Sequence, residues 1–142
     1  MYCLVLRQLN GINKGIQAAH ACLEYANAFH NELDYQKYIN VDKTLIMLDG
    51  GTFHDLVDID NQLCNFDINH AFFAEPDLGD IITAVCFIAD ERVWDREKYA
   101  LSLEDYENQF DFHGNENEWI EYVGGDKNAL LIDILRGKRL SM

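Results

Sequence analysis

Two apolar runs separated by only four residues constrain the fold of this chain most. "HAFFAE" (His70–Glu75) and "DIITAVCFIAD" (Asp80–Asp90) have the length and the apolar, partly β-branched composition of strands, and "PDLG" (Pro76–Gly79) joins them. Four residues are too few for a crossover between parallel strands. The sequence therefore predicts that these two runs pair as an antiparallel hairpin.

Two more strand-length apolar runs, Tyr2–Leu6 and Thr44–Leu48, precede the hairpin, and each is followed by a stretch with helical periodicity. Both connections are long enough for parallel pairing. The order strand-helix-strand-helix-strand-strand predicts an α/β fold. We expect a small mixed four-stranded sheet with helices on its faces, over residues 1–90.

The first predicted helix runs from about Asn13 to Glu32, after a loop that contains Asn10-Gly11. Its expected packing face consists of Ile16, Ala19, Leu23 and Ala26. The second helix follows the predicted turn Asp49–Gly51, with Thr52 or Asp55 as its N-cap. Its side chains expected to face the core are Phe53, Leu56, Val57, Leu63 and Cys64. The segment Asp34–Lys43 between them is predicted to be a polar connection.

Residues 91–142 are predicted to form a helical C-terminal extension. The expected helical segments are Arg92–Tyr99, Glu104–Phe110, Glu118–Val123, and a last helix with Asp126 as N-cap that ends before Gly137. The segment has too few apolar residues for a separate core. We therefore expect an acidic extension packed on the same domain as residues 1–90.

The net charge of the chain limits the classes of partner that it can bind. Twenty-five acidic and eleven basic residues give a net charge of −14, and no Lys or Arg occurs between Lys98 and Lys127. Such a field repels polyanions and disfavours extended, non-specific binding to nucleic acid. This charge is typical of a solvated surface, or of an acidic face that binds a basic protein or mimics nucleic acid.

The composition also predicts a cytoplasmic chain with no membrane span and no cofactor. Its apolar runs are short, and its start lacks the features of a secretory signal. No two of the four cysteines have CxxC spacing, and all four are expected to be buried free thiols. His54 and Asp58 are spaced i, i+4 like a metal pair, but no third ligand is identifiable, so no metal site is predicted.

The stretch "NKGIQAAHA" (Asn13–Ala21) places three polar side chains near the start of the first helix. Lys14, Gln17 and His20 follow one another at i, i+3 spacing, so they can share one side of the helix. A helix N-terminus also favours an anion. Lysine, amide and imidazole together can bind an anion, hold a water molecule and relay protons. The alternative is that His20 is only a half-buried histidine beside the apolar face.

The hairpin turn is the second candidate site. Glu75, Asp77 and Asp80 crowd one turn, and Thr83 lies just inside the following strand. Carboxylates at strand ends can serve as general bases, and open α/β sheets place their binding groups there. The alternative is an acidic, solvated turn.

Together these features resemble the type II peptidyl-tRNA hydrolases. The likeness covers residues 1–90 and rests on the first strand, "Lys14-Gly15", "Gln17-Ala18-Ala19-His20-Ala21", and the turn "Glu75-Pro76-Asp77-Leu78-Gly79" before Thr83. Only one lysine of the family's loop is present, and either Glu75 or Asp77 would replace its aspartate. The resemblance implies a small mixed sheet and a metal-independent hydrolase of the ester between peptide and tRNA, or of a related acyl ester.

The resemblance also implies the roles of the site residues. Asp77 or Glu75 would orient or deprotonate a water molecule, and Lys14 would stabilise an oxyanion or a tRNA phosphate. Gln17, His20 and Thr83 would position the water and the 3′ end. Arg7 belongs to the small set of cations available to bind tRNA.

The alternative function is a non-catalytic acidic binding or inhibitor protein with the same fold, which engages a basic or nucleic-acid-binding partner. The expected partners are the 3′ end of peptidyl-tRNA or a basic protein, and a homodimer is a further possibility.

Overall fold

The computed structural model describes residues 1–95, 98–99, 102, 104, 106, 108 and 116–141. The chain divides into two compact units. One comprises Met1–Ile88 together with the chain end from Lys138, and the other comprises Ala89–Gly137. The packing of the extension on the core stays a prediction.

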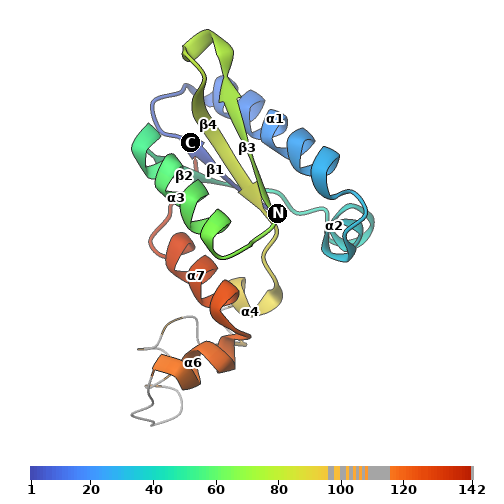
Figure 1. Ribbon diagram of the computed structural model, residues 1–142, viewed down its shortest axis with the longest axis vertical. Helices are drawn as coiled ribbons and strands as arrows, with labels where there is room; N and C mark the ends of the chain where they lie inside the picture. Colours follow the sequence, from blue (N-terminus) through green and yellow to red (C-terminus); the bar gives the residue numbers. More distant parts are fainter. Residues whose placement is uncertain are drawn as a thin grey trace. The chain divides into compact units, whose positions relative to one another are not determined.

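A four-stranded mixed sheet forms the centre of the first unit (Figure 1). Its strands are β1 (Tyr2–Leu6), β2 (Ile46–Gly51), β3 (His70–Glu75) and β4 (Ile81–Phe87), in the order β2-β1-β4-β3. β1 and β2 are parallel, whereas β4 is antiparallel to both β1 and β3. The predicted α/β class, mixed sheet and hairpin are confirmed. The bounds of two strands were wrong: β2 begins at Ile46 and includes Asp49–Gly51, and β4 begins at Ile81 and ends at Phe87.

Two long helices pack on this sheet, α1 (Gly11–Phe29) and α3 (Phe53–Asn65). Asn10 caps α1 by accepting a hydrogen bond from the Asn13 backbone N–H at 3.0 Å. Thr52 caps α3 in a capping box with Asp55, which satisfies two of the free N–H groups at the helix start. The segment between α1 and β2 is more regular than expected. It contains α2 (Leu33–Lys37) and the π-helical turn η1 (Tyr38–Asp42).

The buried side of α1 differs from the predicted one. Its buried residues are Lys14, Gln17, Ala18, Ala21 and Tyr25. Ile16, Ala19 and Leu23 are exposed, so the predicted packing face was wrong. Small side chains explain the difference, because Ala18 and Ala21 let the helix approach the sheet closely, against Cys3 and Val5. Sheet residues that alternate with these, such as Leu4 and Val85, point to the opposite face, where α3 lies (Figure 1).

On α3, Leu56, Ile59 and Leu63 are buried at helical spacing. Cys64 is exposed, so its predicted burial was wrong. Its side chain lies one residue, or about 100°, round the helix from Leu63.

The chain end covers the outer edge of β2. Leu140 forms an antiparallel bridge with Leu48. The Asp49 N–H donates to the Arg139 carbonyl oxygen at 2.8 Å, and the Ser141 N–H donates to the Met47 carbonyl oxygen at 2.9 Å. This pairing satisfies backbone groups that an edge strand otherwise leaves open, and it brings Lys138 and Arg139 into the first unit.

The second unit contains α4 (Glu91–Trp94), α6 (Glu116–Val123) and α7 (Asp126–Leu135). Its buried apolar residues are Val93, Trp119, Val123, Ala129, Leu131, Ile132 and Ile134. The N-cap of α7 is Gly125, not Asp126, and α4 is shorter than the predicted segment. The helix expected at Glu104–Phe110 lies largely outside the described residues. Among the described helices, none combines the length and hydropathy needed to cross a bilayer.

Candidate functional site

The candidate site lies at the edge of the sheet where β1, β2 and β3 end. β1 and β2 are parallel, and β3 runs in the same direction because both β1 and β3 are antiparallel to β4. The starts of α1 and α3 follow the ends of β1 and β2 at this edge. The turn after Glu75 lies there too. Binding groups of open α/β sheets gather at such carboxyl ends.

Gln17 is the centre of a hydrogen-bonded chain at this edge. Its Nε2 donates to Glu75 Oε2 at 2.7 Å, and its Oε1 accepts from Thr83 Oγ1 at 2.5 Å. Gln17 is 5% exposed and Thr83 is fully buried. Because a carboxylate only accepts and a hydroxyl can donate, the two partners fix the orientation of the amide. We call Gln17, Glu75 and Thr83 the amide cluster.

A β-bulge directs Thr83 toward α1. Phe73 pairs with Ala84 and Ala74 pairs with Ile82, so Thr83 is the extra residue in β4. Ala84 belongs to the core cluster under α1. An extra residue disturbs the strict alternation of side chains, and here it turns the Thr83 hydroxyl to the same face. A longer contact, 3.3 Å, joins Thr83 Oγ1 to the Phe73 carbonyl oxygen.

His20 lies one helical turn beyond Gln17 and is exposed. Its ring stacks on Phe73, with the ring centroids 4.3 Å apart and the planes inclined by 15°. Phe73 therefore connects His20 to the strand that carries Glu75. Lys14 lies one turn before Gln17 and is 7% exposed. The α1 side chains of the predicted site thus follow one side of the helix.

The two candidate carboxylates occupy different environments. Glu75 is half-buried and bonded to Gln17. Asp77 is exposed in the short 3-10 helix η2 (Pro76–Leu78), and its backbone N–H contacts Glu75 Oε1 at 3.4 Å. The structure brings Glu75 into the amide cluster, whereas no described contact joins the Asp77 side chain to it.

Arg7 lies at the same edge, just after β1, and pairs with Asp49. Its Nε donates to Asp49 Oδ2 at 2.8 Å, and its side chain is 62% exposed. Burial raises the pKa of Asp49, but the Gly51 N–H, the Arg7 guanidinium and the charge of Lys14 outweigh it, so this pKa lies below its usual value.

Hydrogen bonds from Thr52 lower the pKa of the exposed Asp55, with smaller contributions from Lys138 and Arg7. Positive charge therefore collects at this edge of an acidic chain.

Two groups of described residues have the composition of a metal site, and neither includes the amide cluster. One consists of Cys22 on α1 with Cys3 and Cys86 on the strands beneath it, and the other of Asp60, Cys64 and His70 where α3 ends and β3 begins. His54 and Asp58, the pair considered from sequence, are both outside these two groups, and His54 is exposed.

In the sulfur group, Cys3 and Cys86 are buried and their thiols contact carbonyl oxygens of α1. Sequence reasoning missed the second group, although the i, i+4 spacing of Asp60 and Cys64 and the short link to His70 were visible signals.

In comparisons with known proteins, no family model and no curated protein matches this chain.

Proposed function

We propose that this chain is a metal-independent hydrolase that cleaves the ester between peptide and tRNA, or a related acyl ester. The observation that carries the proposal is the hydrogen-bonded chain from Glu75 through Gln17 to Thr83, beside the exposed ring of His20. These residues belong to the helix motif and the hairpin on which the resemblance to type II peptidyl-tRNA hydrolases rests.

Glu75 is our candidate for the general base. One of its oxygens is held by Gln17, and both oxygens keep further lone pairs for a water molecule. In the proposed step the carboxylate takes a proton from water while the water oxygen attacks the ester carbonyl carbon. The tetrahedral oxyanion then collapses and the bond to the ribose oxygen breaks, while the protonated Glu75 carboxyl returns its proton to that oxygen.

The other residues of the site orient Glu75 and the substrate or stabilise the oxyanion. Gln17 and Thr83 hold Glu75 in one orientation, because both are buried and bonded in series. The exposed face of His20 can stack on a terminal base or donate a proton, and we assign Lys14 to the developing oxyanion. An ester needs less activation than an amide, so one base and accurate positioning suffice.

The charge distribution suits recognition of a short segment of nucleic acid. Arg7 and the chain-end residues Lys138 and Arg139 lie in the first unit, and Arg139 bonds to the strand that carries Asp49, the partner of Arg7. The rest of the chain is strongly acidic. We therefore propose a small contact with the 3′ end rather than with the body of a tRNA, and a rate that falls as salt rises.

The test is release of the N-blocked amino acid from N-acetyl-aminoacyl-tRNA, at low salt and with a chelator present. Wild type is compared with His20→Ala, and with His54→Ala as a control for loss of an exposed histidine. We expect turnover in the chelator that falls in His20→Ala and persists in His54→Ala. Folded wild type without turnover at enzyme excess would overturn the hydrolase and favour the non-catalytic acidic binding protein.

A further inference from the structure

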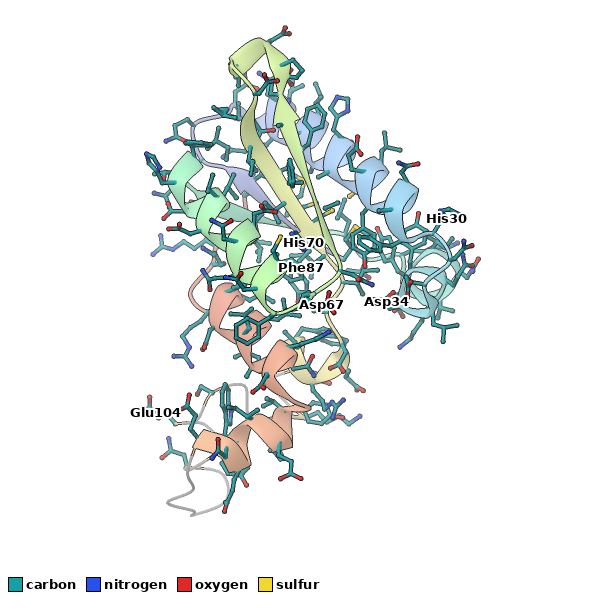
Figure 2. The ribbon with its side chains drawn as sticks, viewed as in Figure 1. His30, Asp34, Asp67, His70, Phe87 and Glu104 are labelled. Atoms are coloured by element: carbon teal, nitrogen blue, oxygen red, sulfur yellow. The ribbon has the colours of Figure 1, made fainter. Side chains whose placement is uncertain are left out.

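Three side chains of metal-ligating type meet where α3 ends and β3 begins. Asp60 and Cys64 lie one turn apart on α3. His70, which Figure 2 labels, is the first residue of β3. One ligand atom from each lies within 4.8 Å of the other two. Five residue steps along β3 separate His70 from Glu75, so the two sites are about 17 Å apart along the strand.

The hydrogen bonds of His70 determine which of its nitrogens is available. Nδ1 lies 2.7 Å from the Ile68 carbonyl oxygen, an acceptor, so Nδ1 carries the proton. In the neutral ring, Nε2 then carries a lone pair. It lies 2.9 Å from Asp60 Oδ1 and 3.6 Å from Cys64 Sγ. A ring nitrogen, a carboxylate and a sulfur thus converge on one point. With a proton on Nε2 the ring pairs with Asp60, and without that proton the three groups present lone pairs that a metal cation can bind.

A cysteine nucleophile with a histidine base does not fit this arrangement. In such sites the two nitrogens of the ring face different partners, one the nucleophile and the other the orienting carboxylate. Here Asp60 and Cys64 both face Nε2, and the backbone holds Nδ1. A ring held by Nδ1–H to a carbonyl with Nε2 left for a ligand is the usual arrangement of a metal-bound histidine.

We propose that Asp60, Cys64 and His70 bind a Zn²⁺ ion. Sulfur, nitrogen and oxygen ligands together suit Zn²⁺, whereas Mg²⁺ and Ca²⁺ prefer oxygen alone. From typical bond lengths, neighbouring ligand atoms around a tetrahedral Zn²⁺ are about 3.3–3.6 Å apart, so small side-chain rotations suffice. The side chains of His70 and Asp60 are 11% and 16% exposed, and Cys64 is exposed, so ions can reach the site and a fourth position is left for water.

The test uses Co²⁺ as a spectroscopic substitute for Zn²⁺, on the full chain after metal removal. A Co²⁺–thiolate bond gives an intense near-ultraviolet charge-transfer band, and Zn²⁺ displaces Co²⁺ from a shared site because it binds more tightly. The variants are Cys64→Ser, Asp60→Asn and His70→Gln. Cys22→Ala is the matched control, because it removes a thiol from the separate group of Cys3, Cys22 and Cys86.

We expect the band in wild type and in Cys22→Ala, its loss in Cys64→Ser, and weaker binding in Asp60→Asn and His70→Gln. Circular dichroism confirms that each variant is folded. A band that persists in Cys64→Ser or disappears in Cys22→Ala would assign the metal elsewhere. Folded wild type that binds neither Co²⁺ nor Zn²⁺ would exclude the site. The ester assay in chelator has a separate readout, so the two proposals fail independently.

Discussion

The two ends of β3 carry polar clusters built on opposite principles. At the Glu75 end, every contact pairs a donor with an acceptor: the Thr83 hydroxyl donates to the Gln17 amide oxygen, and the Gln17 NH₂ donates to Glu75. At the His70 end, three groups that can each act as an acceptor face one another. The first cluster has matched donors and acceptors, whereas the second needs a positive charge, either a proton on Nε2 or a metal cation, beside Asp60.

This difference explains why we assign positioning chemistry to one end and metal binding to the other. A buried network with matched donors and acceptors holds one geometry and fixes the direction of a reactive group. Converging acceptors repel one another unless a positive charge lies among them. Substitutions at each end therefore have distinct consequences.

Among substitutions of the residues that position Glu75, Gln17→Leu should have the largest effect, because the amide is the only link between Glu75 and Thr83 among the described contacts. Misplacement of a catalytic group by about 1 Å lowers the rate by about 100-fold. We expect a loss of that size in ester hydrolysis, measured under single-turnover conditions.

The matched control is Gln62→Leu, the same change at an exposed position of α3. Equal rates for Gln17→Leu and wild type would show that the amide cluster does not position the base.

Zn²⁺ should stabilise the chain through the His70 end alone. At a free concentration about 100 times the dissociation constant, an ion that binds only the folded state adds about 2.7 kcal/mol to the free energy of unfolding. We expect Zn²⁺ to raise the melting temperature of wild type and of Gln17→Leu, and to raise that of Asp60→Asn much less. An equal rise in Asp60→Asn would contradict the assigned ligands.

Thr83→Val should destabilise the fold by about 1–3 kcal/mol, because it leaves the buried Gln17 oxygen without its donor. The shape of the side chain is nearly unchanged, so packing contributes little. Thr44→Val, at an exposed position, should stay within about 0.5 kcal/mol of wild type. Urea denaturation measures both, and equal stabilities would show that another group satisfies Gln17.

Arg7→Gln should have the smallest effect, about 0.5 kcal/mol, because Arg7 is largely exposed. The pKa of Asp49 is lowered in the folded chain. The stabilisation of the fold by the ionised Asp49 is therefore complete above the usual pKa of 3.8, and it is lost as the pH falls through the lowered pKa. We expect Arg7→Gln to weaken the dependence of stability on pH in this acid range. Lys37→Gln, which removes an exposed cation elsewhere, should leave that dependence unchanged.

Local patterns in the sequence predicted the strands well. The bounds of β1 and β3 match the apolar runs, and Thr52 caps α3 as its position before a helical pattern indicates. The four-residue link between the last two runs determined the pairing of β3 with β4. These features depend on a few neighbouring residues, which is why the sequence alone reveals them.

The buried face of α1 was not predictable from hydrophobicity. Ala18 and Ala21 are buried because they are small, while the larger Leu23 is 66% exposed. Gln17 can be buried because it forms hydrogen bonds with Glu75 and Thr83. These partners lie 58 and 66 residues away in the sequence. A helical periodicity cannot show such partners.

The bulge at Thr83 and the metal-type group at His70 also depend on tertiary structure. An extra residue in β4 becomes visible only once the register with β3 is known. His70 meets Asp60 because the end of α3 folds back onto the first residue of β3. Both sites are therefore products of how the elements pack.

The most direct test of the central claim compares Glu75→Gln with Asp77→Asn in single-turnover hydrolysis of N-acetyl-aminoacyl-tRNA. Both changes remove one carboxylate with little change of shape, and the amide oxygen introduced by Glu75→Gln can still accept the hydrogen bond from Gln17. If Glu75 is the general base, Glu75→Gln should lose about 100- to 10,000-fold in rate and Asp77→Asn should stay near wild type. A large loss in Asp77→Asn with a near-normal rate in Glu75→Gln would contradict our account of the amide cluster.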